Sequence, residues 1–371
     1  MNLLSYIIWN GSPDIFSVGP ITLRWYGLLF ALGFLLSQQI LYYIYKKEGK
    51  PEKDVDTLTI YMVIATIIGA RLGHVFFYEP ARYLANPIDI IKIWEGGLAS
   101  HGAGVGIFIA LWLYARKNRP GQSYLQVLDR IAILVALTGA LIRLGNFANS
   151  EIIGKETTAG YGVVFTRNVT ELLQRDPEVE KISYQSSDGA PNEAGYKPIK
   201  ILVEFEADRQ SEQELHMYMT SRFYDRIIYN TYINEHINQS TPIQYFLAKQ
   251  DNGRYAAVVH TNAIARHPAQ LYESISCLLL FILLYWMWKR QKENLPAGRI
   301  FGTFMIILWT LRFLYEYLKE VQVDTEISFI NTYGINYGQL YSIPFVIFGI
   351  VVLVLSFRSG TQGPAINEKN S

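Results

Sequence analysis

Long apolar stretches constrain the fold of this chain more than any other feature of its sequence. A helix that crosses the hydrocarbon core of a bilayer needs about 20 mostly apolar residues. Seven stretches qualify to differing degrees, although the third is weakened by glycines and the sixth carries two charges. They cover residues 21–45, 56–78, 97–115, 125–147, 268–288, 300–318 and 337–357. The sequence therefore predicts an all-α polytopic membrane protein with about seven transmembrane helices.

The charges of the short loops predict the orientation of these helices. Lysine and arginine gather in the cytoplasmic loops of membrane proteins. The loops after the first, third and fifth stretches hold eleven such residues, against three in the opposite short loops, namely Arg82, Lys92 and Lys319. We therefore expect the N-terminus outside and the C-terminus in the cytoplasm.

A long polar segment, residues 155–265, lies between the fourth and fifth apolar stretches on the outer side. Apolar and mostly polar residues alternate over 199–205, which predicts a half-buried strand. Residues 212–230 are expected to be helical, and 255–260 to form another strand. We predict a small α+β extracytoplasmic domain at 155–265, inserted between membrane-core segments 1–154 (spans one to four) and 266–371 (spans five to seven and a cytoplasmic tail).

Composition excludes several classes of function. Charged residues make up only 18% of the 371 residues, against about a quarter in soluble domains, and the formal net charge of +1 argues against a nucleic-acid partner. The one cysteine, Cys277, permits neither an intramolecular disulfide nor a cysteine-rich metal site. Neither metal-ligand spacing nor a phosphate-cradling nucleotide loop is present, so no cofactor and no metal are expected.

The fourth apolar stretch ends in a polar motif. Arg143, Asn146 and Asn149 recur every three residues, close to one helix face, and Glu151 and Gly154 follow. A cation flanked by neutral amide donors suits an anionic oxygen such as that of a phosphate. The alternative is an interfacial arginine that extends to the headgroups, followed by ordinary capping residues.

Histidine and further charges occur in other apolar stretches, where ionisable groups are costly and usually functional. His101, among closely spaced glycines, is a candidate base near neutral pH, or else a packed polar side chain. Arg312 and Glu316 are four residues apart, either as a structural ion pair or as part of a site. Arg71, with Arg143 and Arg312, would form a cationic cluster toward the outer leaflet.

The remaining polar candidates lie where helices are expected to begin. Gln270 and Glu273 follow Arg266-His267-Pro268 and are expected to face cations. Gln339 opens the last stretch, where it would supply hydrogen bonds, and Tyr26 opens the first.

Taken together and in this order, these motifs resemble those of the bacterial prolipoprotein diacylglyceryl transferases. The resemblance covers nearly all seven spans and is strongest at the motif from Arg143 to Gly154. It also includes Arg24-Trp25-Tyr26-Gly27, Trp94-Glu95-Gly96-Gly97 through His101-Gly102, Arg266-His267-Pro268 through Glu273, and Gly338-Gln339-Leu340 through Pro344.

The resemblance implies a reaction and its participants. Members of the family transfer the diacylglyceryl group of phosphatidylglycerol to the lipobox cysteine thiol of a prolipoprotein, forming a thioether and releasing glycerol phosphate. Partners would be phosphatidylglycerol, the prolipoprotein signal peptide with its lipobox, and membrane lipid, in the bacterial inner (cytoplasmic) membrane.

Residue roles follow from the same resemblance. His101, Arg143, Arg312 and Glu151 are the expected catalytic residues, with the two arginines on the phosphate and His101 as base. The expected substrate-binding residues are Tyr26, Arg71, Asn146, Asn149, Gly154, Arg266, Gln270, Glu273, Glu316 and Gln339.

Two positions depart from the family pattern, and two other functions compete with this one. Leu308 stands where the family often has a tyrosine, and Lys319 where it often has an arginine. Lysine lacks the bidentate phosphate geometry of arginine. A secondary transporter of a lipid or small anion is the main alternative, although the halves of the chain show no repeat. A non-catalytic lipid-binding protein is the other.

Overall fold

The computed structural model describes residues 6–19, 21–93, 96–206, 211–250, 253–320 and 324–359. The chain divides into two compact units. The strand-rich unit comprises Met1–Leu29, Ile142–Ser274 and Tyr315–Gly334. The helical unit comprises Phe30–Leu141, Ile275–Leu314 and Ile335–Ser371.

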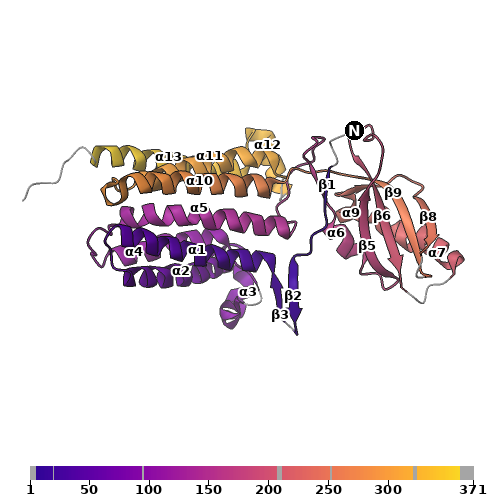
Figure 1. Cartoon of the computed structure of the whole chain (residues 1–371), viewed down its shortest axis with the longest axis horizontal. Helices are drawn as coiled ribbons and strands as arrows, with labels where there is room; N and C mark the ends of the chain where they lie inside the picture. The colour runs from indigo at the N-terminus through magenta and orange to yellow at the C-terminus, as the bar shows by residue number, and fades with distance from the viewer. Residues whose placement is uncertain are drawn as a thin grey trace, which may run out of the picture. The chain divides into compact units, whose positions relative to one another are not determined.

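The helical unit is a bundle of long apolar helices that run alongside one another (Figure 1). Within the described residues, six helices are long and apolar enough to cross a membrane, and a seventh, α4, is apolar but only 16 residues long. The predicted polytopic helical fold is confirmed. The helices are α1 (Trp25–Lys47), α2 (Lys53–Phe77), α4 (Ser100–Ala115), α5 (Tyr124–Ala148), α10 (Ala269–Gln291), α11 (Arg299–Tyr315) and α13 (Tyr337–Ser359).

Two of the predicted spans begin later than expected. The first starts at Trp25, because Ile21–Arg24 form a strand instead. The third starts at Ser100, because Gly96 and Gly97 have φ angles of 90° and 71°, which a right-handed helix cannot contain. Two short helical segments precede it, α3 (Pro80–Ala85) and η1 (Pro87–Ile91).

Glycines allow α2 and α4 to pack backbone against backbone. A Cβ on Gly69 would lie 2.5 Å from the carbonyl oxygen of Gly102, and one on Gly73 would lie 2.7 Å from Gly102 Cα. Small residues permit such close helix contacts in membrane proteins. Gly102 and Gly106 of the predicted third span therefore have a packing role.

The buried start of α5 carries charges that sequence analysis did not single out. Asp129 accepts hydrogen bonds from the backbone amides of Gly298 and Phe301, both at 2.8 Å, and so caps α11. Beside it, Arg130 pairs with Glu48 at 2.7 Å. Each of these charges has a partner, which offsets the cost of burial.

The strand-rich unit contains an antiparallel sheet with helices packed against it (Figure 1). Strand β6 (Lys197–Phe205) pairs with β5 (Val179–Ser186) and β9 (Tyr255–Ala263), and β9 also pairs with β7 (Ile237–Asn238) and β8 (Gln244–Lys249). Alternate side chains of β6, from Ile199 to Phe205, are buried. The helices of this layer are α6 (Arg167–Leu173), α7 (Glu212–Tyr218), α8 (Tyr224–Tyr229) and α9 (Thr231–Asn234).

Both predicted strands and the predicted helix at 212–230 are therefore confirmed, although the helix is divided into pieces by the π-helical segment η3 (Met219–Phe223). The limits of the insert, 155–265, stay a prediction.

Further short elements complete this unit. Strand β1 (Ile7–Trp9) pairs in parallel with β4 (Val163–Phe165), and β2 (Asp14–Val18) forms a hairpin with β3 (Ile21–Arg24). Helix α12 (Asp324–Tyr333) follows the short η5 (Glu316–Leu318). The ring of Trp9 in β1 lies 4.6 Å from that of Phe147 at the end of α5. The N-terminal strand thus packs against the segment that carries the polar motif.

Candidate active site

The polar motif lies where α5 ends and the chain turns away. Ser150 and Ile152 both have positive φ angles, 54° and 55°, which cost a non-glycine residue of order 1 kcal/mol. The turn directs the Glu151 carboxylate back toward the helix, where it accepts hydrogen bonds from the amide nitrogens of Asn146 (3.2 Å) and Asn149 (3.1 Å). The two asparagines, predicted on one helix face, therefore share a carboxylate.

Arg143 begins a chain of ion pairs on the same unit. Its Nε lies 2.6 Å from Glu273 Oε2, and Glu273 Oε1 lies 2.6 Å from Lys319 Nζ, which is also 3.5 Å from Glu316 Oε1. The side chains are 23% exposed at Arg143 and about a tenth exposed at the other three. We call these four residues the charged cluster.

One part of Arg143 is available to a ligand. Its Nη1 donates to Asn146 Oδ1 at 3.4 Å, whereas Nη2 has no hydrogen-bond partner within the described part of the chain. A guanidinium presents its donors in a planar fork that matches two oxygens of a phosphate. An anion that reaches Arg143 would therefore find donors already oriented by Glu273 and Asn146.

Backbone pairing brings together three segments, which we call the motif segments: the end of the polar motif at Gly154, the entry to the next predicted span at His267, and the end of η5 at Leu318 with Lys319. Gly154 forms a bridge with Lys319, its amide donates to the carbonyl of His267 (2.9 Å), and the amide of Lys155 donates to that of Leu318 (2.6 Å). A Cβ on Gly154 would lie 2.7 Å from His267 O and 2.8 Å from Leu318 O. Glycine is required at this position for packing, which is independent of the substrate contact predicted for it.

Arg266 and Gln270 are buried and form hydrogen bonds to these segments. Arg266 is 2% exposed and donates to the carbonyl oxygens of Glu235 (2.7 Å) and Gly154 (3.4 Å) and to the Glu320 carboxylate. Gln270 donates to the carbonyl of Glu151. A substrate contact for either residue stays a prediction, and these contacts show that both link backbone segments of this unit.

Tyr26 also lies against the motif. A Cβ on Gly145 would lie 3.0 Å from both Cα and Cδ2 of Tyr26. The glycine one turn before Asn149 thus lets the start of α1 approach this part of α5, which places Tyr26 beside the motif.

In the helical unit, Arg71 binds backbone rather than presenting a free cation. It is 3% exposed and donates to five carbonyl oxygens of the segment before α4. These bonds include Ile90 O at 2.8 Å, Gly96 O at 2.6 Å and the Asp89 carbonyl. A role for Arg71 in a cationic cluster stays a prediction, whereas its contacts fix the loop that leads to His101.

The other candidates of the helical unit are placed as follows. His101, the second residue of α4, is exposed and packs edge-to-face on Phe77, with ring centroids 5.0 Å apart. The guanidinium of Arg312 lies 5.9 Å from the Trp309 ring centroid. Gln339, 2% exposed, donates to Phe313 O and accepts from a backbone amide at the start of α13. Trp94 and Glu95 lie outside the described residues.

Comparison with known proteins identifies the family. The family model described as prolipoprotein diacylglyceryl transferase matches residues 13–355. The chain belongs to this family.

Named relatives share most of the length of the chain. It is similar to the phosphatidylglycerol–prolipoprotein diacylglyceryl transferase of Tolumonas auensis, 35% identical over 352 residues, which are 95% of this chain and 98% of the relative. The enzyme of that name from Chloroherpeton thalassium is 34% identical over 361 residues, covering 96% and 97%. That of Porphyromonas gingivalis is also 34% identical, covering 97% and 98%.

The structure shows the surroundings of the two residues that depart from the pattern of the transferase family, Lys319 and Leu308. Lys319 lies within the charged cluster, where sequence analysis had given it no role in the site. Its place at the position of a common family arginine was the signal that could have drawn attention to it. Leu308 packs against the apolar core of the helical unit. The phenol of Tyr315 donates to the carbonyl of Tyr272, one residue before Glu273, at 3.4 Å.

Proposed function

We propose that the charged cluster is where this diacylglyceryl transferase binds the phosphate that leaves in its reaction. The chain is a phosphatidylglycerol–prolipoprotein diacylglyceryl transferase, a multi-pass membrane enzyme. The observation that supports the site is the Arg143–Glu273–Lys319 chain, with both ion pairs at 2.6 Å. These ion pairs join three segments that are distant in the sequence. Nη2 of Arg143 is available to contact a ligand.

The proposed reaction is a substitution at carbon. The cysteine thiolate of the prolipoprotein attacks a carbon of phosphatidylglycerol. This carbon belongs to the diacylglyceryl group and is the one bonded to the phosphate oxygen. A carbon–sulfur bond forms and the carbon–oxygen bond breaks, so that glycerol phosphate leaves with the bonding electron pair, while the thiol proton passes to a base. Such a reaction needs an activated nucleophile and fixed positive charge where the leaving group develops negative charge.

The chain offers groups for each requirement. Arg143 would contact the phosphate through Nη2, with Glu273 holding its Nε. Lys319, a point charge rather than a fork, would add a second cation on the far side of Glu273. Asn146 and Asn149 would orient Glu151 toward the headgroup hydroxyls. We retain His101 as the proposed base and Arg312 as a further phosphate ligand.

We further propose that the reaction occurs at the outer leaflet of the bacterial cytoplasmic membrane. The loop charges favour an extracytoplasmic N-terminus. With that topology the end of α5 that carries Asn146 and Asn149 faces outward. An exported cysteine would meet a phospholipid headgroup there.

Purified protein in detergent, given phosphatidylglycerol and a lipobox peptide, tests the activity. Mass spectrometry should detect peptide carrying a thioether-linked diacylglyceryl group, and none when the peptide cysteine is replaced by serine. Detergent removes the two compartments that a transporter needs, so product formation would exclude a purely transporting protein. Absence of product under conditions that support a known transferase would overturn the proposal.

A further inference from the structure

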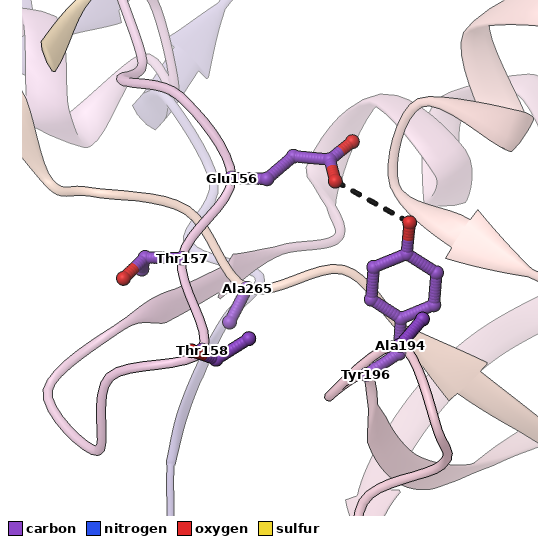
Figure 2. Close-up of a pocket in the computed structure, with 6 residues that line it drawn as sticks. All are labelled: Glu156, Thr157, Thr158, Ala194, Tyr196 and Ala265. Atoms are coloured by element: carbon purple, nitrogen blue, oxygen red, sulfur yellow. Dashed lines mark hydrogen bonds between the residues drawn. The ribbon is translucent and has the colours of Figure 1, made fainter.

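A polar cavity of about 320 Å³ lies in the strand-rich unit, beyond the charged cluster along the chain. Figure 2 shows its lining. Glu156, Thr157 and Thr158 follow the polar motif, Ala194 and Tyr196 belong to the connection between β5 and β6, and Ala265 follows β9. Within the lining, the Tyr196 phenol donates to Glu156 Oε2 at 3.3 Å.

Backbone hydrogen bonds and close packing hold the walls of the cavity in place. The amide of Thr157 donates to Ala265 O at 2.8 Å, and Glu156 forms a bridge with Arg266. On the opposite wall, the backbone amide of Tyr196 donates to Asn192 Oδ1 at 2.9 Å. Gly195, with φ of 82°, lies so near Thr158 that a Cβ would be 2.4 Å from its Cγ2. Preformed cavities of this kind are typical of binding sites.

The chemistry of the lining favours a peptide over an anion. Among the described residues it offers a carboxylate, two threonines, a phenol and two alanine methyl groups, and it includes no lysine or arginine. The Arg266 guanidinium lies 3.9 Å from Glu156 Oε1 and is itself buried, and the Lys197 ammonium donates to the carbonyl oxygen of Thr158 at 3.2 Å. A phosphate would face the Glu156 carboxylate, whereas peptide amides and small polar side chains would find acceptors.

The cavity lies within reach of a peptide whose cysteine occupies the charged cluster. Gly154 is paired with Lys319, and Glu156 is two residues further on, at most about 7 Å along an extended chain. A substrate strand advances about 3.3 Å per residue. We place the cysteine near the ammonium group, at the end of the Lys319 side chain, so the length of that side chain adds to the distance. Roughly the second to fourth residues after the cysteine would then reach the cavity.

We propose that this cavity binds the segment of the prolipoprotein that directly follows the acceptor cysteine, through its backbone amides and small polar side chains. The inference rests on the proposed function, since it assigns a place to one part of that substrate. A substitution that fills the cavity should therefore change KM for the peptide and leave KM for phosphatidylglycerol unchanged.

Two peptides and a matched pair of variants test the proposal. One peptide ends at the cysteine as an amide, and the other continues for four further residues. Ala194→Trp fills the cavity from its rim, and Glu193→Trp places the same bulk on the neighbouring exposed residue, which does not line the cavity.

We expect the wild-type enzyme to show a KM about tenfold lower for the longer peptide, the gain from one or two hydrogen bonds. That ratio should fall to about one in Ala194→Trp and persist in Glu193→Trp. If Ala194→Trp does not fold, Tyr196→Phe, which removes a single hydroxyl, is expected to lower the ratio about threefold.

Equal KM values for the two peptides in the wild-type enzyme would overturn the proposal, as would an unchanged ratio in the variant that folds. An increase in KM for phosphatidylglycerol in Ala194→Trp would identify a headgroup site instead and would also overturn it. Failure of the proposed function is distinguishable, because the wild-type enzyme would then form no thioether with either peptide.

Discussion

Replacing Gly154 with alanine tests whether the three motif segments must lie in backbone contact. The added Cβ would lie 2.7 Å from both the Cβ and the carbonyl oxygen of His267, and 2.8 Å from the carbonyl oxygen of Leu318. Carbon atoms in ordinary contact are about 3.5–4.0 Å apart. Since two of these neighbours are backbone atoms, no side-chain rotation relieves the clash, and the paired segments themselves must separate by several tenths of an ångström.

The cost follows from what is attached to those segments. Overpacking of this kind costs about 1–3 kcal/mol of stability. Lys319 is paired with Gly154, and it carries the ion pair to Glu273 that continues to Arg143. A misplacement of about 1 Å in a catalytic group costs roughly 100-fold in rate. We therefore expect Gly154→Ala to lower kcat about 100-fold, together with a loss of stability of about 1–3 kcal/mol that leaves the protein folded.

Thioether formation with phosphatidylglycerol and a lipobox peptide, measured beside thermal unfolding in detergent, provides the assay. Gly104→Ala is the matched control, because a Cβ there would have no atom within 4 Å and alanine is favoured over glycine in a helix by about 1 kcal/mol. Gly104→Ala should retain the wild-type rate, with a Tm equal to or slightly above that of the wild type. If Gly154→Ala kept more than half of the wild-type kcat, the argument from backbone contact would be wrong.

Three further changes have expected outcomes. Arg71→Lys gives up most of the five carbonyl contacts and should cost about 3 kcal/mol of stability. It should also expose residues 86–93 to proteolysis, and a cleavage pattern like that of the wild type would refute this. Arg266→Lys removes a buried fork and should lower stability by about 2–4 kcal/mol; an unchanged Tm would contradict its positioning role. Burial, with a smaller contribution from Arg266, lowers the pKa of His236 from 6.5 to about 4. The unfolded chain therefore binds more protons between pH 6.5 and 4, so stability should fall by up to about 3 kcal/mol as the pH is lowered through this window. Denaturation midpoints should show this slope in the wild type and not in His236→Asn; equal slopes in the two would refute it.

The helical part of the fold could be predicted because apolar length is a local property of the sequence. The start of the first span could not, because Ile21–Arg24 continue the apolar pattern and yet pair with β2. The parallel pair of β1 with β4 joins three-residue strands that are far apart in the chain. Strands so short contain too few residues for an alternation to be recognised.

Residue spacing could predict part of the geometry at the end of α5. Asn146, in the last turn of α5, and Asn149, directly after the helix ends, both donate to Glu151, as a spacing of three allows. The partner of Glu273 was expected only to be a cation, because a pairing between distant segments depends on the tertiary fold. Arg71 shows a different limit: its acceptors are backbone carbonyls, which every residue carries and no sequence pattern marks.

The rate of thioether formation by Arg143→Ala tests whether Arg143 binds the phosphate of phosphatidylglycerol. Arg222→Ala is the control, since Arg222 is a mostly exposed arginine of the same unit, paired with Glu178. Removal of a donor that stabilises charge in a transition state costs about 10²–10³ in kcat. We expect such a loss in Arg143→Ala, with the wild-type rate in Arg222→Ala and both variants folded. A rate for Arg143→Ala within a few-fold of the wild type would contradict this role of Arg143.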